Sequence, residues 1–172
     1  MKSSQLIDFS IDKKNKKVNV IKEFDAPISK VWSAWTESEL LDKWWAPKPW
    51  KSKTKTMDFR IGGFWLYAMV GPNGEEIWGR EDYKSIVPLK RIMAQDAFTD
   101  SEGNVDKNFP RTNWKMDFKT SDNSTIVEIE LTYDKSSDLR RIIEMGFKEG
   151  FIQALENLDN LLNHAGNIHQ FT

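Results

Sequence analysis

The chain has 172 residues, enough for one domain with a full hydrophobic core, so we expect a single domain over residues 1–172. Its formal net charge of −1 argues against a nucleic-acid-binding protein, and the absence of cysteine excludes disulfides and thiolate metal sites. No apolar run reaches the length of a membrane span and the N-terminus has no signal-peptide pattern, so we expect a cytoplasmic protein.

The first part of the chain predicts strands followed by two short helices. Residues 5–11 alternate weakly between apolar and polar side chains, and residues 18–24 are rich in the β-branched and aromatic residues typical of strands. Pro27 fits the first turn of a helix, whose apolar residues recur at helical spacing. A second short, tryptophan-rich helix follows and ends before Pro47.

The middle of the chain predicts strands separated by turns. Residues 59–70 contain two strands that a glycine pair separates, and residues 77–87 and 91–98 form two more. Between them, Asn73-Gly74 predicts a hairpin with a type I′ turn, because both residues tolerate a positive φ.

The last part of the chain predicts two further strands and one long helix. Residues 114–119 and 127–133 alternate between apolar and polar side chains, as in an antiparallel sheet with one buried face. Residues 137–163 carry a broad apolar stripe and would form a helix about 40 Å long. Gly146 and Gly150 lie on this stripe. They indicate either close approach of the helix to the sheet or room for a ligand above the strands.

The chain contains four motifs in this order: FDAPISKVWSAWTESELLDKWWAP, DFRIGG, MVGPNG and MGFKEGFIQALENLDNLL. Together they resemble the motifs of the Aha1-like family within the START-like/SRPBCC superfamily. The members of this family are homologues of an activator of the Hsp90 ATPase. The resemblance extends over about residues 5–163. It implies an α+β helix-grip fold, as in the birch-pollen-allergen (Bet v 1-like) class. Such a fold has a curved antiparallel sheet of six or seven strands around a long C-terminal helix, with two short helices after the first strand.

The resemblance implies less about function. Relatives of this kind include polyketide cyclases, lipid carriers and an antibiotic-resistance protein, which share a cavity rather than one set of catalytic residues. The eukaryotic activator binds the chaperone through a separate N-terminal domain, for which this chain has no room. We therefore do not expect Hsp90 as a partner.

We expect a cavity between the sheet and the C-terminal helix, closed at one end by the two tryptophan helices. Trp44 and Trp45 are adjacent, so a helix cannot turn both inward, and one of them is expected at the mouth. Polar groups available for the inner surface are Tyr67, Arg80, Glu81 and Asp96, although structural ion pairs or solvent exposure would also explain the charged ones. The predicted lining is Trp44, Trp45, Phe64, Leu66, Tyr83, Phe147, Gly150 and Phe151.

The leading functional hypothesis is binding of a small apolar or aromatic molecule, without cofactor, metal or nucleic acid. The alternatives are a protein-interaction module of the chaperone-activator type and an enzyme of the cyclase or hydrolase kind. No catalytic residue can be assigned, because the two histidines, His164 and His169, both lie near the C-terminus. A cavity filled by side chains would favour the interaction module, and a buried carboxyl with a raised pKa opposite a tyrosine would favour the enzyme.

Overall fold

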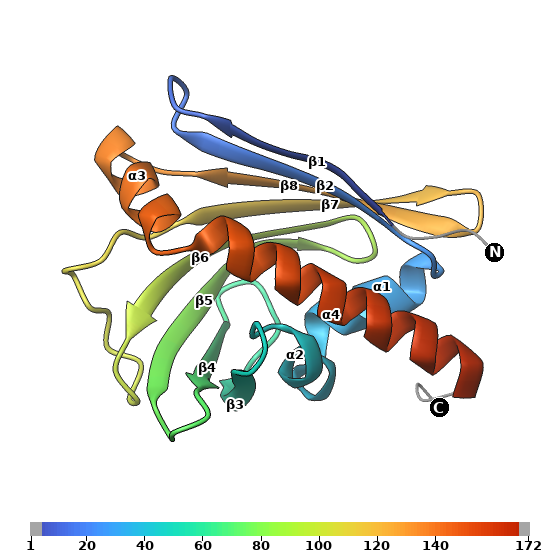
Figure 1. Cartoon of the computed structure of the whole chain (residues 1–172), viewed down its shortest axis with the longest axis horizontal. Helices are drawn as coiled ribbons and strands as arrows, with labels where there is room; N and C mark the ends of the chain where they lie inside the picture. The colour runs from blue at the N-terminus through green and yellow to red at the C-terminus, as the bar shows by residue number, and fades with distance from the viewer. Residues whose placement is uncertain (1–4, 169–172) are drawn as a thin grey trace.

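Eight antiparallel strands form one curved sheet in the computed structural model, which describes residues 5–168 and the side chains of residues 8–163 (Figure 1). Four helices accompany the sheet in this part of the chain. In chain order the elements are β1 (Gln5–Asp12), β2 (Lys17–Phe24), α1 (Ile28–Thr36), α2 (Ser38–Trp44), β3 (Lys51–Met57), β4 (Phe64–Val70), β5 (Glu76–Val87), β6 (Arg91–Thr99), β7 (Asn113–Ser121), β8 (Ser124–Thr132), α3 (Ser136–Glu144) and α4 (Phe147–Ile168).

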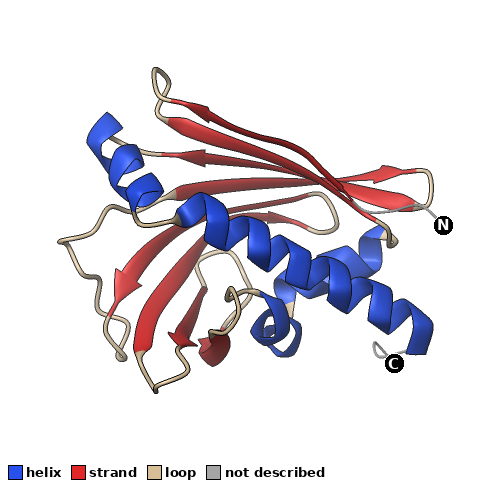
Figure 2. Ribbon diagram, viewed as in Figure 1, coloured by secondary structure: helices blue, strands red, loops and turns tan. Residues whose placement is uncertain are grey.

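The strand order is β1-β2-β8-β7-β6-β5-β4-β3, so the chain crosses from one half of the sheet to the far edge through α1 and α2. Figure 2 shows α4 running across the curved sheet, with α1 and α2 beside it. This arrangement confirms the α+β helix-grip fold. The sheet has eight strands instead of six or seven. The sequence of edge strand β3, KSKTKTM, lacks the apolar alternation that marks a half-buried strand.

The C-terminal segment is two helices, and the prediction of one continuous helix over residues 137–163 is wrong. Gly146 has a φ of +89°, and its N–H donates to the carbonyl oxygen of Ile143 at 3.0 Å. Glycine adopts this left-handed conformation without a Cβ clash and commonly stops a helix. Gly146 therefore ends α3 and sets the direction in which α4 leaves.

The β4–β5 hairpin lies where Asn73-Gly74 predicted it, but the type I′ turn is wrong. Gly74 has a φ of +86°, whereas Asn73 is not among the residues with a positive φ. The N–H of Gly71 donates to the carbonyl oxygen of Glu75 at 2.8 Å, and the N–H of Gly74 donates to that of Gly71 at 3.1 Å. These bonds close a three-residue loop with its glycine in the left-handed position, the next most common hairpin connection.

Helix α4 is held by apolar packing and by polar contacts to β2 and to the end of α2. Leu155 and Leu158 are at most 1% exposed and belong to the main core. The Lys22 ammonium on β2 lies 2.8 Å from a carboxylate oxygen of Asp159. The Asn157 amide donates to the carbonyl oxygen of Ala46, just after α2, at 3.0 Å. The helix is thus tied both to the sheet and to the segment that closes one end of it.

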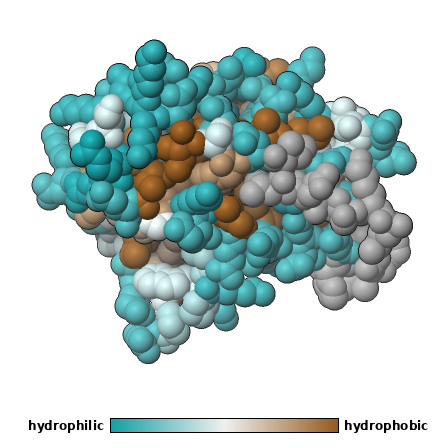
Figure 3. Space-filling view, turned by 45° about the horizontal axis from the view of Figure 1, so that its top comes forward, coloured by the Kyte–Doolittle hydropathy of each residue, from teal (hydrophilic) through white to brown (hydrophobic). Residues whose placement is uncertain are grey.

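Hydrophilic side chains cover most of the face drawn in Figure 3, and hydrophobic ones gather near its middle. None of the helices in residues 5–168 is both long and apolar enough to cross a membrane.

A candidate ligand-binding cavity

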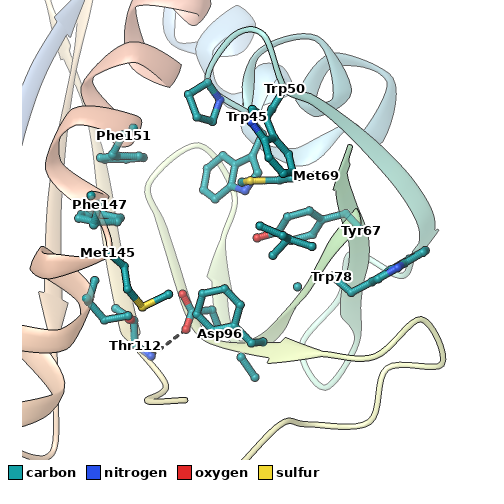
Figure 4. A pocket seen from close by; sticks show the side chains of 18 of the residues that line it. Trp45, Trp50, Tyr67, Met69, Trp78, Asp96, Thr112, Met145, Phe147 and Phe151 are labelled. Atoms are coloured by element: carbon teal, nitrogen blue, oxygen red, sulfur yellow. Dashed lines mark hydrogen bonds between the residues drawn. The ribbon is translucent and has the colours of Figure 1, made fainter. Parts of the chain in front are cut away.

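A cavity of about 350 Å³ lies between strands β4–β6 and the end of α3 and first turns of α4 (Figure 4). This volume is near the lower end of the range of about 300–1,000 Å³ for ligand pockets. The lining residues are Trp45, Pro47, Trp50, Tyr67, Met69, Ile77, Trp78, Gly79, Asp96, Ala97, Phe98, Thr112, Trp114, Ile142, Met145, Gly146, Phe147, Gly150 and Phe151.

Aromatic rings form one wall of the cavity. Phe147 and Phe151 are four residues apart on α4, so they share a face of the helix, and their rings stack at 5.3 Å. The Trp114 ring on β7 meets Phe151 edge to face at 5.5 Å, and the Trp45 ring lies 5.7 Å from Trp114. Three segments far apart in the sequence therefore supply one continuous aromatic surface.

Two glycines shape the cavity in different ways. Gly79 on β5 lies opposite Tyr67 on β4, and a Cβ at Gly79 would meet the Tyr67 hydroxyl and ring at 2.9 Å. Gly79 is therefore needed for the Tyr67 ring to lie across β5. A Cβ at Gly150 would meet only Pro47, at the ordinary contact distance of 3.7 Å. Close helix packing thus does not require Gly150, whose lack of a side chain keeps the cavity open.

Asp96 on β6 provides the carboxylate of the cavity. One of its oxygens accepts a hydrogen bond from the N–H of Thr112 at 2.7 Å, and the other accepts one from Trp114 Nε1 at 2.9 Å. Burial raises the pKa of Asp96 to about 6, although these bonds and Arg111 act in the opposite direction. The Arg111 guanidinium binds the Asp96 main-chain oxygen at 2.9 Å and an Asp82 carboxylate oxygen at 2.8 Å.

Glu81 lies directly opposite Asp96 in the β5–β6 pairing and is 4% exposed. Burial raises the pKa of Glu81 well above its ordinary value, and Asp96 and Asp82 add to this, so the neutral carboxyl is favoured. Burial also raises the pKa of Tyr67 well above its usual range, with Glu81 contributing. The Asp96 and Glu81 carboxyls and the Tyr67 hydroxyl form a buried acidic cluster, of which Asp96 and Tyr67 line the cavity and Glu81 does not.

A second, much smaller cavity of about 10 Å³ lies behind the first. Trp35 Nε1, Trp45 Nε1 and Glu81 Oε2 are buried without a hydrogen-bond partner among the described residues, and all three residues line this space. Its volume suits one water molecule, which would find two donors and one acceptor there. Trp45 separates this site from the main cavity.

The structure brings six of the predicted residues to the main cavity: Trp45, Phe147, Gly150, Phe151, Tyr67 and Asp96. Trp44 is not among them. It points into the core, where its Nε1 donates to the carbonyl oxygen of Ala34 at 2.9 Å. Tyr83 is also elsewhere: its ring lies 4.9 Å from that of Phe59, and it lines the small cavity beside Glu81.

Phe64, Leu66 and Arg80 lie on the other face of the sheet, which corrects their predicted place. Side chains alternate along a strand, so the neighbours of the inward-facing Tyr67 face outward. The Arg80 guanidinium lies 4.5 Å from the centre of the Phe64 ring and donates to an Asp82 carboxylate oxygen at 2.8 Å. Arg80 is thus a structural ion-pair residue.

Several lining residues were missed. Met69 was recoverable, because it shares the parity of Tyr67 on β4. Trp50 and Met145 lie outside the helices and strands, where no periodicity predicts the direction of a side chain. The side chains of His164 and His169 lie outside the described residues.

Comparison with known proteins identifies the family. The chain matches the model of the family described as "Activator of Hsp90 ATPase homolog 1-like protein" over residues 25–163, and no curated protein matches. A solution structure of an Arthrobacter aurescens protein is 26% identical, with a TM-score of 0.88 and 93% of each chain covered. A crystal structure of a Mycobacterium smegmatis protein is also 26% identical, with a TM-score of 0.85, covering 92% of this chain and 97% of the other. Because the family match spans most of the chain and the fold agrees, the protein belongs to the Aha1-like family of the SRPBCC superfamily.

Proposed function

We propose that the protein binds a small apolar or aromatic molecule in the cavity between the sheet and α4. The observation that carries this proposal is a cavity of about 350 Å³ walled by aromatic rings, with few polar groups. Ligand pockets have this composition. Gly150 adds support, because alanine would fit there and would favour the helix by about 1 kcal/mol.

A second candidate is an enzyme of the cyclase or hydrolase kind that uses the same cavity. Asp96, with its pKa of about 6, and the Tyr67 hydroxyl both line the cavity, and a general base works best with a pKa near the operating pH. Glu81, the carboxyl with the more strongly raised pKa, lines only the small cavity behind Trp45. The interaction-module hypothesis gains nothing here, because side chains do not fill the space.

The test is a screen of two- and three-ring aromatics, sterols and fatty acids by thermal shift and by tryptophan emission. Binding to the folded state raises the melting temperature by mass action. Trp45, Trp50, Trp78 and Trp114 line the cavity, so emission should change on binding. The control is Gly150→Leu, which places a side chain in the cavity. The proposal fails if no compound acts by both readouts, or if Gly150→Leu responds as the wild type does.

A further inference from the structure

We propose that the cavity selects an aromatic ligand that carries a hydrogen-bond donor, best a protonated amine, placed against Asp96, and that it rejects carboxylates of the same shape. This inference rests on the proposed function of the cavity and specifies its ligand class.

The charge of the lining disfavours an anionic ligand. Among the described residues that line the cavity, Asp96 is the only acid and none is Lys, Arg or His. The guanidinium groups of Arg80 and Arg111, which do not line the cavity, both bind Asp82 at 2.8 Å. An anionic ligand would therefore meet a carboxylate and no free cation inside the cavity, and burial without a partner is costly for a charged group.

Asp96 has hydrogen-bonding capacity that the protein does not use. Each of its oxygens accepts one bond from the protein, from Thr112 or from Trp114, whereas a carboxylate offers about four acceptor positions. Figure 4 shows the Asp96 carboxylate at the edge of the cavity, on the side towards Thr112. A ligand N–H or O–H can thus add a bond without displacing either protein donor. Charge-assisted bonds are the stronger kind, which favours the amine.

The aromatic wall of the cavity favours a cationic ligand. The rings of Trp45, Trp114, Phe147 and Phe151 surround the space beside Asp96, and such rings attract a cation through their electron-rich faces. The same faces disfavour an anion.

The experiment compares three ligands with the same ring system on the wild-type protein. Naphthalene-2-methylamine, naphthalene-2-methanol and naphthalene-2-carboxylate are titrated by calorimetry at pH 7.5. We expect the amine to bind best and the carboxylate at least tenfold more weakly than the amine. If the carboxylate binds as well as the amine, the inference is wrong while the proposed function stands. If none of the three binds, the inference is wrong, and the screen of aromatics, sterols and fatty acids decides the proposed function separately.

Two further measurements assign the selectivity to Asp96. Asp96→Asn removes the charge and keeps one acceptor oxygen, so the ratio of the amine affinity to the alcohol affinity should fall to about one. This variant also removes a hydrogen-bond acceptor from Thr112 or Trp114. The second measurement therefore uses the unchanged wild type and varies the pH instead. The affinity for the amine should fall about tenfold from pH 7.5 to pH 5, as Asp96 with its pKa of about 6 is protonated, and that for the alcohol should not. An equal response of amine and alcohol would contradict the inference.

The other groups around Asp96 do not replace it as the source of this pH response. The lining residues of α3 and α4 include no ionisable side chain. Burial raises the pKa of Tyr67 well above its ordinary value and that of Tyr133 to about 12, so both stay neutral in this range. Arg111 is paired with Asp82 at 2.8 Å. Glu81 favours the neutral form and does not line the main cavity.

Discussion

Two substitutions of Gly150 test separately whether this glycine lowers the stability of the helix and whether it keeps room for a ligand. In Gly150→Ala the new Cβ meets only Pro47, at 3.7 Å, so no strain opposes the gain of about 1 kcal/mol in helix propensity. For a chain of this size that gain raises the melting temperature by about 2–4 °C. Gly150→Leu should also fold, but its side chain extends into the cavity of about 350 Å³ and competes with a ligand.

The assay measures urea unfolding and naphthalene-2-methanol binding for the wild type and both variants. We expect Gly150→Ala to be more stable and to bind at most a few-fold more weakly. We expect Gly150→Leu to be at least as stable as the wild type and to lose more than tenfold in affinity. A loss of stability above 1 kcal/mol in Gly150→Ala would show that the helix needs this glycine for close packing. Unchanged binding by Gly150→Leu would show that ligands do not use this space.

Three further predictions concern the fold and the buried acids. Leu158 is 0% exposed, so Leu158→Ala should lower the free energy of unfolding by about 2–5 kcal/mol. Leu161 is half-buried, so Leu161→Ala should lower it by clearly less. Equal small losses would show that α4 does not close the core. Gly146→Ala should cost about 1–2 kcal/mol, opposite in sign to Gly150→Ala, because its φ is +89°; a stability gain by calorimetry would contradict the helix stop. The raised pKa of Glu81 stabilises the fold at low pH, and this contribution is lost as pH rises, so Glu81→Gln should gain stability relative to the wild type between pH 5 and pH 8. A relative stability that does not change with pH would show that the two states ionise Glu81 alike.

Periodicity predicted most of the fold because strands and helices have fixed repeats. It could not separate Gly146 from Gly150, since both lie on one apolar stripe and only the backbone φ distinguishes the helix stop from the helical glycine. In β4, the inward direction of Tyr67 and the predicted lining by Phe64 and Leu66 were inconsistent, because adjacent residues of a strand face opposite ways. A stricter use of alternation would have selected Met69.

The Glu81–Asp96 pair was beyond reach of the sequence because it depends on a bulge. The pairing Ser85–Met93, continued without irregularity, would place Glu81 opposite Ala97. A register shift between Tyr83 and Ser85 moves the pairing by one residue and sets Glu81 against Asp96. Such a shift leaves no clear sign in the composition of either strand. The acidic cluster therefore emerges only from the three-dimensional structure.

The most direct test of ligand binding is a ¹⁵N-NMR titration of the tryptophan indole N–H signals with naphthalene-2-methanol. Trp45, Trp50 and Trp114 line the cavity, whereas Trp32 packs against Phe59 and Phe118 and does not. The structure predicts saturable shifts for these three of the four tryptophans that line the cavity and none for Trp32. Absence of shifts, or shifts of Trp32 without those of the cavity tryptophans, would contradict ligand binding in this cavity.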